Sequence, residues 1–150
     1  MNSILEIITL ILAGTLAGEE FIVRYGIHPA LSNLERDAHV LARQELIKRL
    51  RIVVPMLMLP TVGMATYWTL SSMGSDGQVF RYIAVAVYFC FLLLSFAGTV
   101  PINIAVGKWS INELPLDWEE VIKKWGFIDI FRSGAAMLGF VCLLIPSIMY

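Results

Sequence analysis

A few ionisable and amide side chains lie inside or beside long apolar runs of this sequence, where such groups are costly and therefore informative. They are Glu19, Glu20, His28, Asn103, Asp129 and Arg132. Carboxylates and imidazoles are the usual general acids and bases, and amides or guanidinium groups can stabilise an oxyanion. A site built from these residues would take a proton from its substrate and hold the negative charge that forms.

The first apolar segment places three of its polar residues on one side. Glu20, Arg24 and His28 follow at four-residue steps, so they stack on one helical face. Pro29 is expected to end that helix. Glu20 and Arg24 can form a simple ion pair, or Glu20 and His28 can do chemistry. Because two adjacent carboxylates cannot face one partner, one of Glu19 and Glu20 is expected to reach the headgroups and the other the bundle interior.

The composition indicates what kind of scaffold positions these residues. The chain has 150 residues, which is the length of a single domain, and 58% of them are hydrophobic. Only 15% are charged, against roughly 25% in soluble domains. This balance rules out a disordered chain and argues against a soluble globule. The net charge of −1 excludes a strongly basic nucleic-acid binder, so the sequence predicts an integral membrane protein.

Windows without charge give the membrane spans. A helix needs about 20 residues to cross the hydrocarbon, and the sequence offers four such segments. They are predicted at approximately 4–23, 52–73, 82–104 and 131–149, within one membrane domain covering residues 1–150. The fold class that follows is all-α, a four-helix transmembrane bundle.

The basic residues set the expected orientation. Every Lys and Arg except Arg81 falls within segments 24–51 and 108–132. Because cytoplasmic loops are enriched in Lys and Arg, loops one and three are predicted to be cytoplasmic. Both termini would then face the periplasm if the membrane is a bacterial inner membrane. The lipid bilayer is the expected partner, nucleic acid is not, and a homodimer is left open.

Two cytoplasmic segments are predicted to extend the spans as amphipathic helices. Ser32 and Glu35 have the spacing of a capping box, which predicts a helix from about Asn33 into the second span. A second start signal at Asp117 predicts a helix that continues into the fourth span. Its common face carries Trp118, Val121, Ile122, Trp125, Asp129 and Arg132.

Small residues at four-residue spacing predict where helices pack closely. Gly14 and Gly18 form one such pair, and Ala135 and Gly139 form another. Small side chains let helix backbones approach each other in lipid. We expect this packing within the bundle rather than between two copies of the chain.

The predicted orientation brings the polar residues together. It places Glu19, Glu20, His28, Asn103, Asp129 and Arg132 at the cytoplasmic end of the four helices. Trp125 adds an aromatic wall. The sequence therefore predicts a polar cavity that opens toward the cytoplasm or the inner leaflet.

Three segments resemble a known family. They are Ala17-Gly18 with His28-Pro29-Ala30-Leu31, then Val100-Pro101-Ile102-Asn103, and then Trp118 with Trp125 and Arg132. In this order they resemble the anthrone oxygenases, small four-helix membrane proteins of a family whose members are largely of unknown function. The resemblance implies oxidation of anthrones to anthraquinones with dioxygen, without a conventional flavin or haem. Many relatives have His at the position of Asp129.

The leading hypothesis is a membrane oxygenase or oxidoreductase for a lipophilic aromatic or quinol-like small molecule. Glu20, His28 or Asp129 would take a phenolic or methylene proton, and Asn103 and Arg132 would stabilise the oxyanion. The residues that would hold the substrate are Trp118, Trp125 and Arg24.

Other interpretations stay open, including whether the protein is an enzyme. The cofactor is unknown, and it is either absent or a metal ion held by Glu20 and His28 together with Glu19 or Asp129. Haem bound through His28 is a further variant. Alternatively the polar cluster is structural, and the chain is a non-enzymatic lipid binder, cofactor binder or complex subunit.

Overall fold

The computed structural model describes residues 3–149, and almost all of them are helical. The helices in chain order are α1 (Ser3–Ile22), η1 (Val23–Ile27), α2 (His28–Ser32), α3 (Arg36–Ser71), α4 (Gln78–Leu93), η2 (Leu94–Thr99), α5 (Val100–Gly107) and α6 (Trp118–Met149). No strand is assigned within residues 3–149, which confirms the all-α class. The segments labelled η are π-helical turns that continue the helices on either side.

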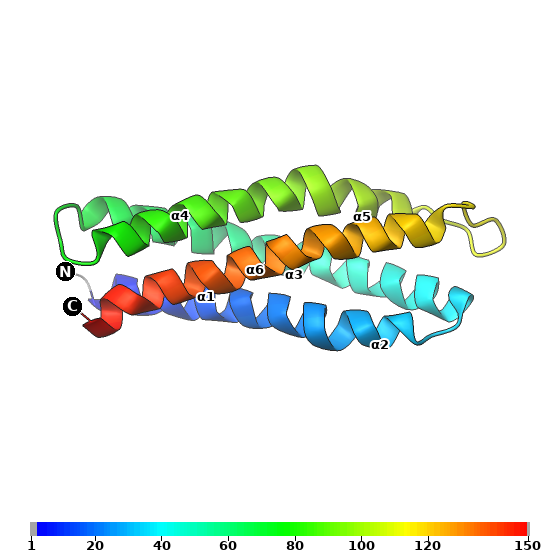
Figure 1. Cartoon of the computed structure of the whole chain (residues 1–150), viewed down its shortest axis with the longest axis horizontal. Coiled ribbons are helices and arrows are strands. Elements are labelled where there is room, and N and C mark those ends of the chain that lie inside the picture. Colours follow the sequence, from blue (N-terminus) through cyan, green and yellow to red (C-terminus); the bar gives the residue numbers. More distant parts are fainter. Residues whose placement is uncertain (1–2, 150) are drawn as a thin grey trace.

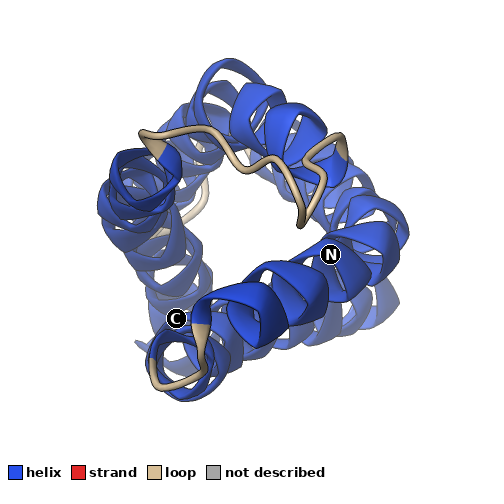
Figure 2. Cartoon of the chain, turned by 90° about the vertical axis from the view of Figure 1, so that its right-hand side faces the viewer, coloured by secondary structure: helices blue, strands red, loops and turns tan. Residues whose placement is uncertain are grey.

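These helices form four columns that lie side by side (Figure 1). The first column is α1–η1–α2, the second is α3, the third is α4–η2–α5, and the fourth is α6. Seen from the end, the columns occupy the corners of a square (Figure 2). α1 packs against α3 and α6, and α4 packs against the same two helices. Helix α1 begins and helix α6 ends at the same end of the molecule, so the chain passes along the molecule four times in alternating directions.

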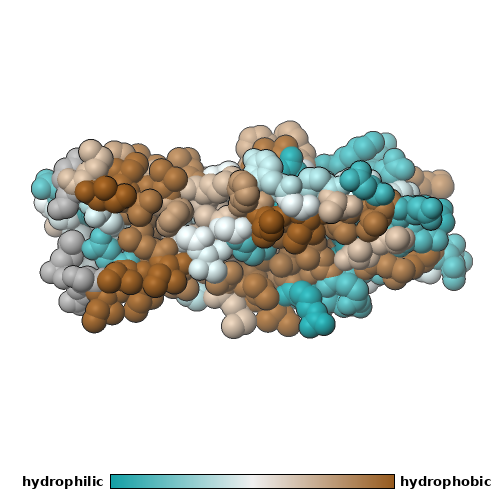
Figure 3. Space-filling view, turned by 90° about the horizontal axis from the view of Figure 1, so that it is seen from below, coloured by the Kyte–Doolittle hydropathy of each residue, from teal (hydrophilic) through white to brown (hydrophobic). Residues whose placement is uncertain are grey.

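Three of the columns are long and apolar enough to cross a membrane, judged by length and composition over the described residues. They are Arg36–Ser71, Gln78–Gly107 and Trp118–Met149. Helix α1 is also largely apolar, but it carries the acidic residues Glu6, Glu19 and Glu20. On the face drawn in Figure 3, hydrophilic side chains gather mainly toward the end that holds the α2–α3 and α5–α6 connections.

Much of the outer surface is apolar. Leu59, Leu93 and Ile148 are among many large hydrophobic side chains that are more than half exposed. The core between the columns contains Trp68 and Phe91, which are almost completely buried. Exposed apolar surface on this scale is what a lipid-facing protein needs.

Two prolines are accommodated by the π-helical turns, so the prediction that Pro29 ends the first helix is wrong. A proline in a helix lacks the N–H donor and clashes with the carbonyl four residues earlier. The chain widens just before Pro29 and Pro101, where the N–H of His28 bonds to the carbonyl of Val23, and that of Val100 to Ser95, five residues back. The helix therefore continues past each proline.

The capping box predicted at Ser32 and Glu35 is also wrong. Ser32 closes the preceding helix, and its hydroxyl donates to the carbonyl of His28 at 3.0 Å. The next helix begins at Arg36 with Glu35 as its N-cap residue and no side-chain cap. The second predicted start is confirmed, because α6 begins at Trp118 and runs without interruption to Met149.

Close packing at small residues is confirmed at two of the predicted positions. A Cβ added to Gly139 would lie 2.7 Å from the ring of Tyr88, and one added to Gly14 would lie 3.2 Å from Phe140. At Gly18 a Cβ would meet nothing within 4 Å, so that glycine is not a contact point. The contact between Tyr88 and Gly139 joins α4 to α6 in the middle of the core.

We expect Gly139→Ala to destabilise the protein by about 1–3 kcal/mol, because the fully buried Tyr88 ring has to move. Gly134→Ala on the same helix is the matched control, since its new methyl group would meet no atom within 4 Å. Unfolding of both variants in mixed micelles of dodecyl maltoside and SDS measures the difference. Equal stability of the two variants would contradict the tight packing at Gly139.

Candidate functional site

A buried ion cluster joins α1 to α6. Nη2 of Arg132 lies 3.0 Å from Oε2 of Glu20 and 3.2 Å from Oδ1 of Asp129. Glu20 and Asp129 have no exposed surface, and Arg132 is 5% exposed. One guanidinium therefore faces two carboxylates inside the protein. Arg132 pairs with Asp129 within α6 and with Glu20 on another helix, so the ion pair of Glu20 is not made with Arg24.

The cluster reaches the third column through Thr99. Nη1 of Arg132 donates to the hydroxyl of Thr99 at 3.5 Å, and that hydroxyl donates to the carbonyl of Ser95 at 3.2 Å. Both residues belong to η2, the turn that widens ahead of Pro101. The guanidinium carbon of Arg132 also lies 5.7 Å from the ring centre of Phe91. Arg132 is thus fixed by α1, α6 and η2 together.

A layer of aromatic and basic side chains lies one to two turns away along α6. The rings of His28 and Trp125 stack with their planes 3° apart and their centres 5.4 Å apart. The guanidinium carbon of Arg43 lies 4.8 Å from the ring centre of Trp125. Arg24 donates to the carbonyl of Gly126 at 3.2 Å, so it does not pair with Glu20.

Gly126 makes room for the stacked histidine. A Cβ at this position would lie 3.1 Å from Nε2 of His28, closer than ordinary van der Waals contact. Burial together with the positive charges of Arg43 and Arg24 and the nearby His39 lowers the pKa of His28 to about 4. At neutral pH the imidazole is therefore uncharged. Its Nε2 is buried without a hydrogen-bond partner.

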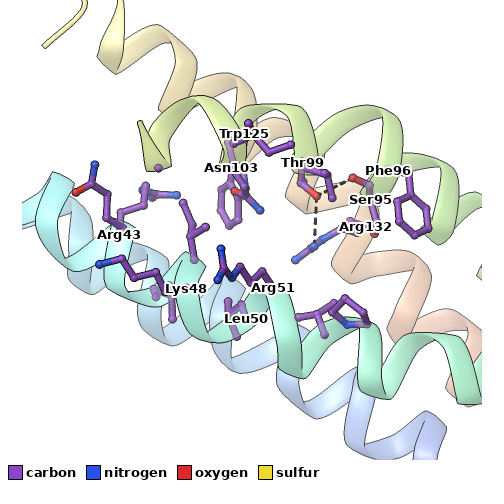
Figure 4. A pocket seen from close by; sticks show the side chains of 18 of the residues that line it. Arg43, Lys48, Leu50, Arg51, Ser95, Phe96, Thr99, Asn103, Trp125 and Arg132 are labelled. Carbon is purple, nitrogen blue, oxygen red and sulfur yellow. Dashed lines mark hydrogen bonds between the residues drawn. The ribbon is translucent and has the colours of Figure 1, made fainter. Parts of the chain in front are cut away.

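Beside the cluster lies a cavity of about 570 Å³ (Figure 4). One wall comes from α3, the opposite wall from η2 and α5, and α6 contributes Trp125 and Arg132. Its polar lining consists of Arg43, Gln44, Lys48, Arg51, Ser95, Thr99, Asn103, Lys108 and Arg132. The volume lies within the range of roughly 300–1,000 Å³ that is usual for small-molecule sites.

The predicted site residues either line the cavity, lie directly behind its lining, or lie apart from it. Asn103, Trp125 and Arg132 line the cavity. Glu20, His28 and Asp129 contact those residues from behind and do not themselves line it.

Two further predicted residues lie apart from the cavity. Arg24 is held at Gly126, and Trp118 packs edge-on against His39 with ring centres 5.9 Å apart. Glu19 is half-buried next to Glu20, and both its carboxylate oxygens lack a hydrogen-bond partner.

Several cavity residues were not predicted from the sequence. The sequence predicts only that an amphipathic helix leads into the second span, and the residues of this helix that line the cavity are Arg43, Gln44, Lys48 and Arg51. Their spacing could have indicated a shared cavity wall. Arg43, Ile47 and Arg51 follow at four-residue steps, so they lie on one face of α3. Gln44 closes the cavity end by donating to the carbonyls of Val106 at 2.9 Å and Trp109 at 3.0 Å.

The described residues do not assemble a metal-binding set. Within residues 3–149, no three His, Cys, Asp or Glu side chains are close enough together to hold a metal ion. Glu20 turns toward Arg132, and His28 stacks on Trp125 instead. Among the described residues the arrangement therefore supplies no third ligand to a metal bound at Glu20 and His28.

Fold and site together define a helical membrane protein with a cavity between its columns that is lined by both apolar and polar side chains. The sequence profile of the anthrone oxygenase family matches residues 44–142, which include all of the third column and most of α3 and α6. The chain belongs to the anthrone oxygenase family. No curated protein and no solved structure matches it.

Proposed function

We propose that the protein spans the membrane four times as a transmembrane bundle, with the α2–α3 and α5–α6 connections in the cytoplasm and both termini outside. Three columns have the length and composition of membrane spans, and α1 offers the fourth. Glu20 does not prevent α1 from crossing, because Arg132 pairs with it inside the protein. The start of α3 and the start of α6 are the cytoplasmic extensions.

The substrate that we propose for the cavity is a lipophilic aromatic or quinol-like molecule, with an anthrone as the simplest case. The observation that carries this proposal is the position of Arg132, which lines the cavity and is fixed by two buried carboxylates. Trp125 supplies an aromatic surface, and Phe96, Val54 and Met58 supply apolar walls. A planar apolar molecule with one polar oxygen fits such a lining.

The proposed reaction starts with the removal of a proton from the methylene carbon of the anthrone. Asp129 lies behind Arg132 and does not line the cavity, so it takes this proton through one bridging water molecule. Its Oδ2 has no hydrogen-bond partner and can accept from that water, while its Oδ1 is held by Arg132. The negative charge moves to the ring oxygen, where Arg132 and Asn103 stabilise it. The electron-rich ring then reduces dioxygen, a carbon–oxygen bond forms, and the loss of water yields the quinone.

Purified protein in dodecyl maltoside, incubated with anthrone in air, tests this proposal. We expect protein-dependent formation of anthraquinone and water, with one dioxygen consumed for each quinone formed. The same incubation under argon should give none. If quinone formation in air is no faster with the protein than with heat-denatured protein, the enzymatic proposal fails and a structural role for the ion cluster takes its place.

A further inference from the structure

The cavity has an excess of positive charge. Five of its lining residues are basic: Arg43, Lys48, Arg51, Lys108 and Arg132. No Asp or Glu lines it. Arg132 is compensated by Glu20 and Asp129, and Lys48 pairs with Glu45 at the surface. The other three cations form no ion pair with any residue of the part of the chain that the structure describes.

Arg43 is the most informative of these three. It is 3% exposed, and its Nη2 is buried without a hydrogen-bond partner. Its Nε donates to Nε2 of His39 at 3.3 Å, so its only side-chain acceptor is a neutral group. Asp129 is the carboxylate that attracts the charge of Arg43 electrostatically, but it is already bonded to Arg132 and does not line the cavity. A buried guanidinium with a free N–H group calls for an anion.

The cavity also provides for an apolar body. Val54 and Met58 are buried in its wall, whereas Phe96 and Ile104 are each 55% exposed on the outer side of the protein. Exposed Lys48, Arg51 and Lys108 lie nearer the end of the molecule. The lining is thus basic around Arg43 and Lys48, and toward Phe96 it combines apolar side chains with Ser95 and Arg132 (Figure 4).

We infer that the ligand of this cavity is an amphiphilic anion, a single carboxylate, phosphate or phenolate group on an apolar body, with its charge against Arg43. The inference deepens the proposed function. It rests on the proposal that this cavity binds the ligand, and it does not depend on the proposed oxidation. It names the charge of the molecule, which the family resemblance leaves open. Such an anion can come from a small aromatic substrate or from an acidic lipid, and both present the same chemistry to Arg43.

The test is binding of a matched pair of fluorescent probes to the purified full chain in dodecyl maltoside. Anthracene-9-carboxylate carries the anion, and 9-anthracenemethanol has the same ring without the charge. We expect the carboxylate to bind about 10- to 100-fold more tightly, the usual worth of a charged hydrogen bond. Equal binding of the two probes to the wild-type protein overturns the inference, whatever the variants do.

Variants then assign the preference to Arg43. Arg43→Gln should remove most of the preference for the carboxylate, and Arg43→Lys should restore part of it. Arg49→Gln is the matched control, because Arg49 is exposed on the same helix and does not line the cavity. An unchanged preference in Arg43→Gln, in protein that keeps the wild-type unfolding transition, contradicts the assignment.

Competition distinguishes the two sources of the anion. If phosphatidylglycerol displaces the probe and phosphatidylcholine does not, an acidic lipid is a ligand. If neither lipid displaces it, the cavity selects small anions. Since no turnover or dioxygen enters these measurements, charge selection without anthrone oxidation would refute the proposed reaction alone. Oxidation without charge selection would refute this inference alone.

Discussion

Replacing Arg132 with glutamine is expected to lower the free energy of unfolding by about 3–5 kcal/mol. The change leaves the carboxylates of Glu20 and Asp129 buried without a counter-charge, and both have no exposed surface. It also removes the link to Thr99 on η2. The measurement is reversible unfolding in dodecyl maltoside and SDS micelles, followed by circular dichroism.

The companion variants separate the lost charge from the lost side chain. In the triple variant Glu20→Gln, Asp129→Asn, Arg132→Gln, no charge is left in the cluster, so we expect much of the stability to return. Arg49→Gln, on the surface, should change stability by less than about 0.5 kcal/mol. If Arg132→Gln were as stable as Arg49→Gln, Arg132 would not be the counter-ion that the geometry indicates.

The second large effect is expected in catalysis. Asp129→Asn should slow oxygen-dependent quinone formation by about 10²–10⁴-fold, which is the usual contribution of a general base. The amide is nearly isosteric with the carboxylate, and Arg132 still has Glu20 as its counter-ion, so the fold should persist. Initial rates with anthrone in air, at substrate concentrations above and below KM, measure the loss.

Two controls make this result specific. Glu119→Gln removes an exposed acid from the same helix and should leave the rate unchanged. Glu20→Gln removes the other carboxylate held by Arg132. If Asp129→Asn keeps its rate and Glu20→Gln loses it, Glu20 is the base. If both retain the wild-type rate and lose only stability, the cluster is structural.

Much of the fold could be predicted from the sequence because apolar runs and helix signals are local. The four helical columns, the continuous helix from Trp118 and the close contact at Gly139 follow from neighbouring residues alone. The errors at Pro29 and Ser32 have a common cause. A proline usually ends a helix, but a wider turn ahead of Pro29 satisfied the backbone and carried the helix on to Ser32.

The members of the ion cluster could be predicted from the sequence, but the partner of each member could not. Orientation brings Glu20, Asp129 and Arg132 to the same level, and the structure places them in contact. Which partner each residue chooses depends on the rotation of one helix against another, which no local pattern specifies. Arg43 could not be predicted as a cavity residue for the same reason. In the sequence it looks like a solvent-exposed charge, and only the structure shows its contact with Trp125.

The two π-helical turns have a consequence for the angular position of everything beyond them. Each residue of an α-helix advances the direction of its side chain by about 100°. In a π-helical turn the N–H bonds to the carbonyl five residues back instead of four. Such a turn contains one more residue than an α-helical turn, but it rotates the chain by the same total angle. If the same residues were wound as a regular α-helix, His28 would be rotated by about 100° away from Trp125, and Asn103 by the same angle away from the cavity. Deleting one residue from η1 or η2 along with the wide turn should leave both side chains facing as they do. The two π-helical turns thus set the rotation of α2 and α5, so that His28 faces Trp125 and Asn103 faces the cavity.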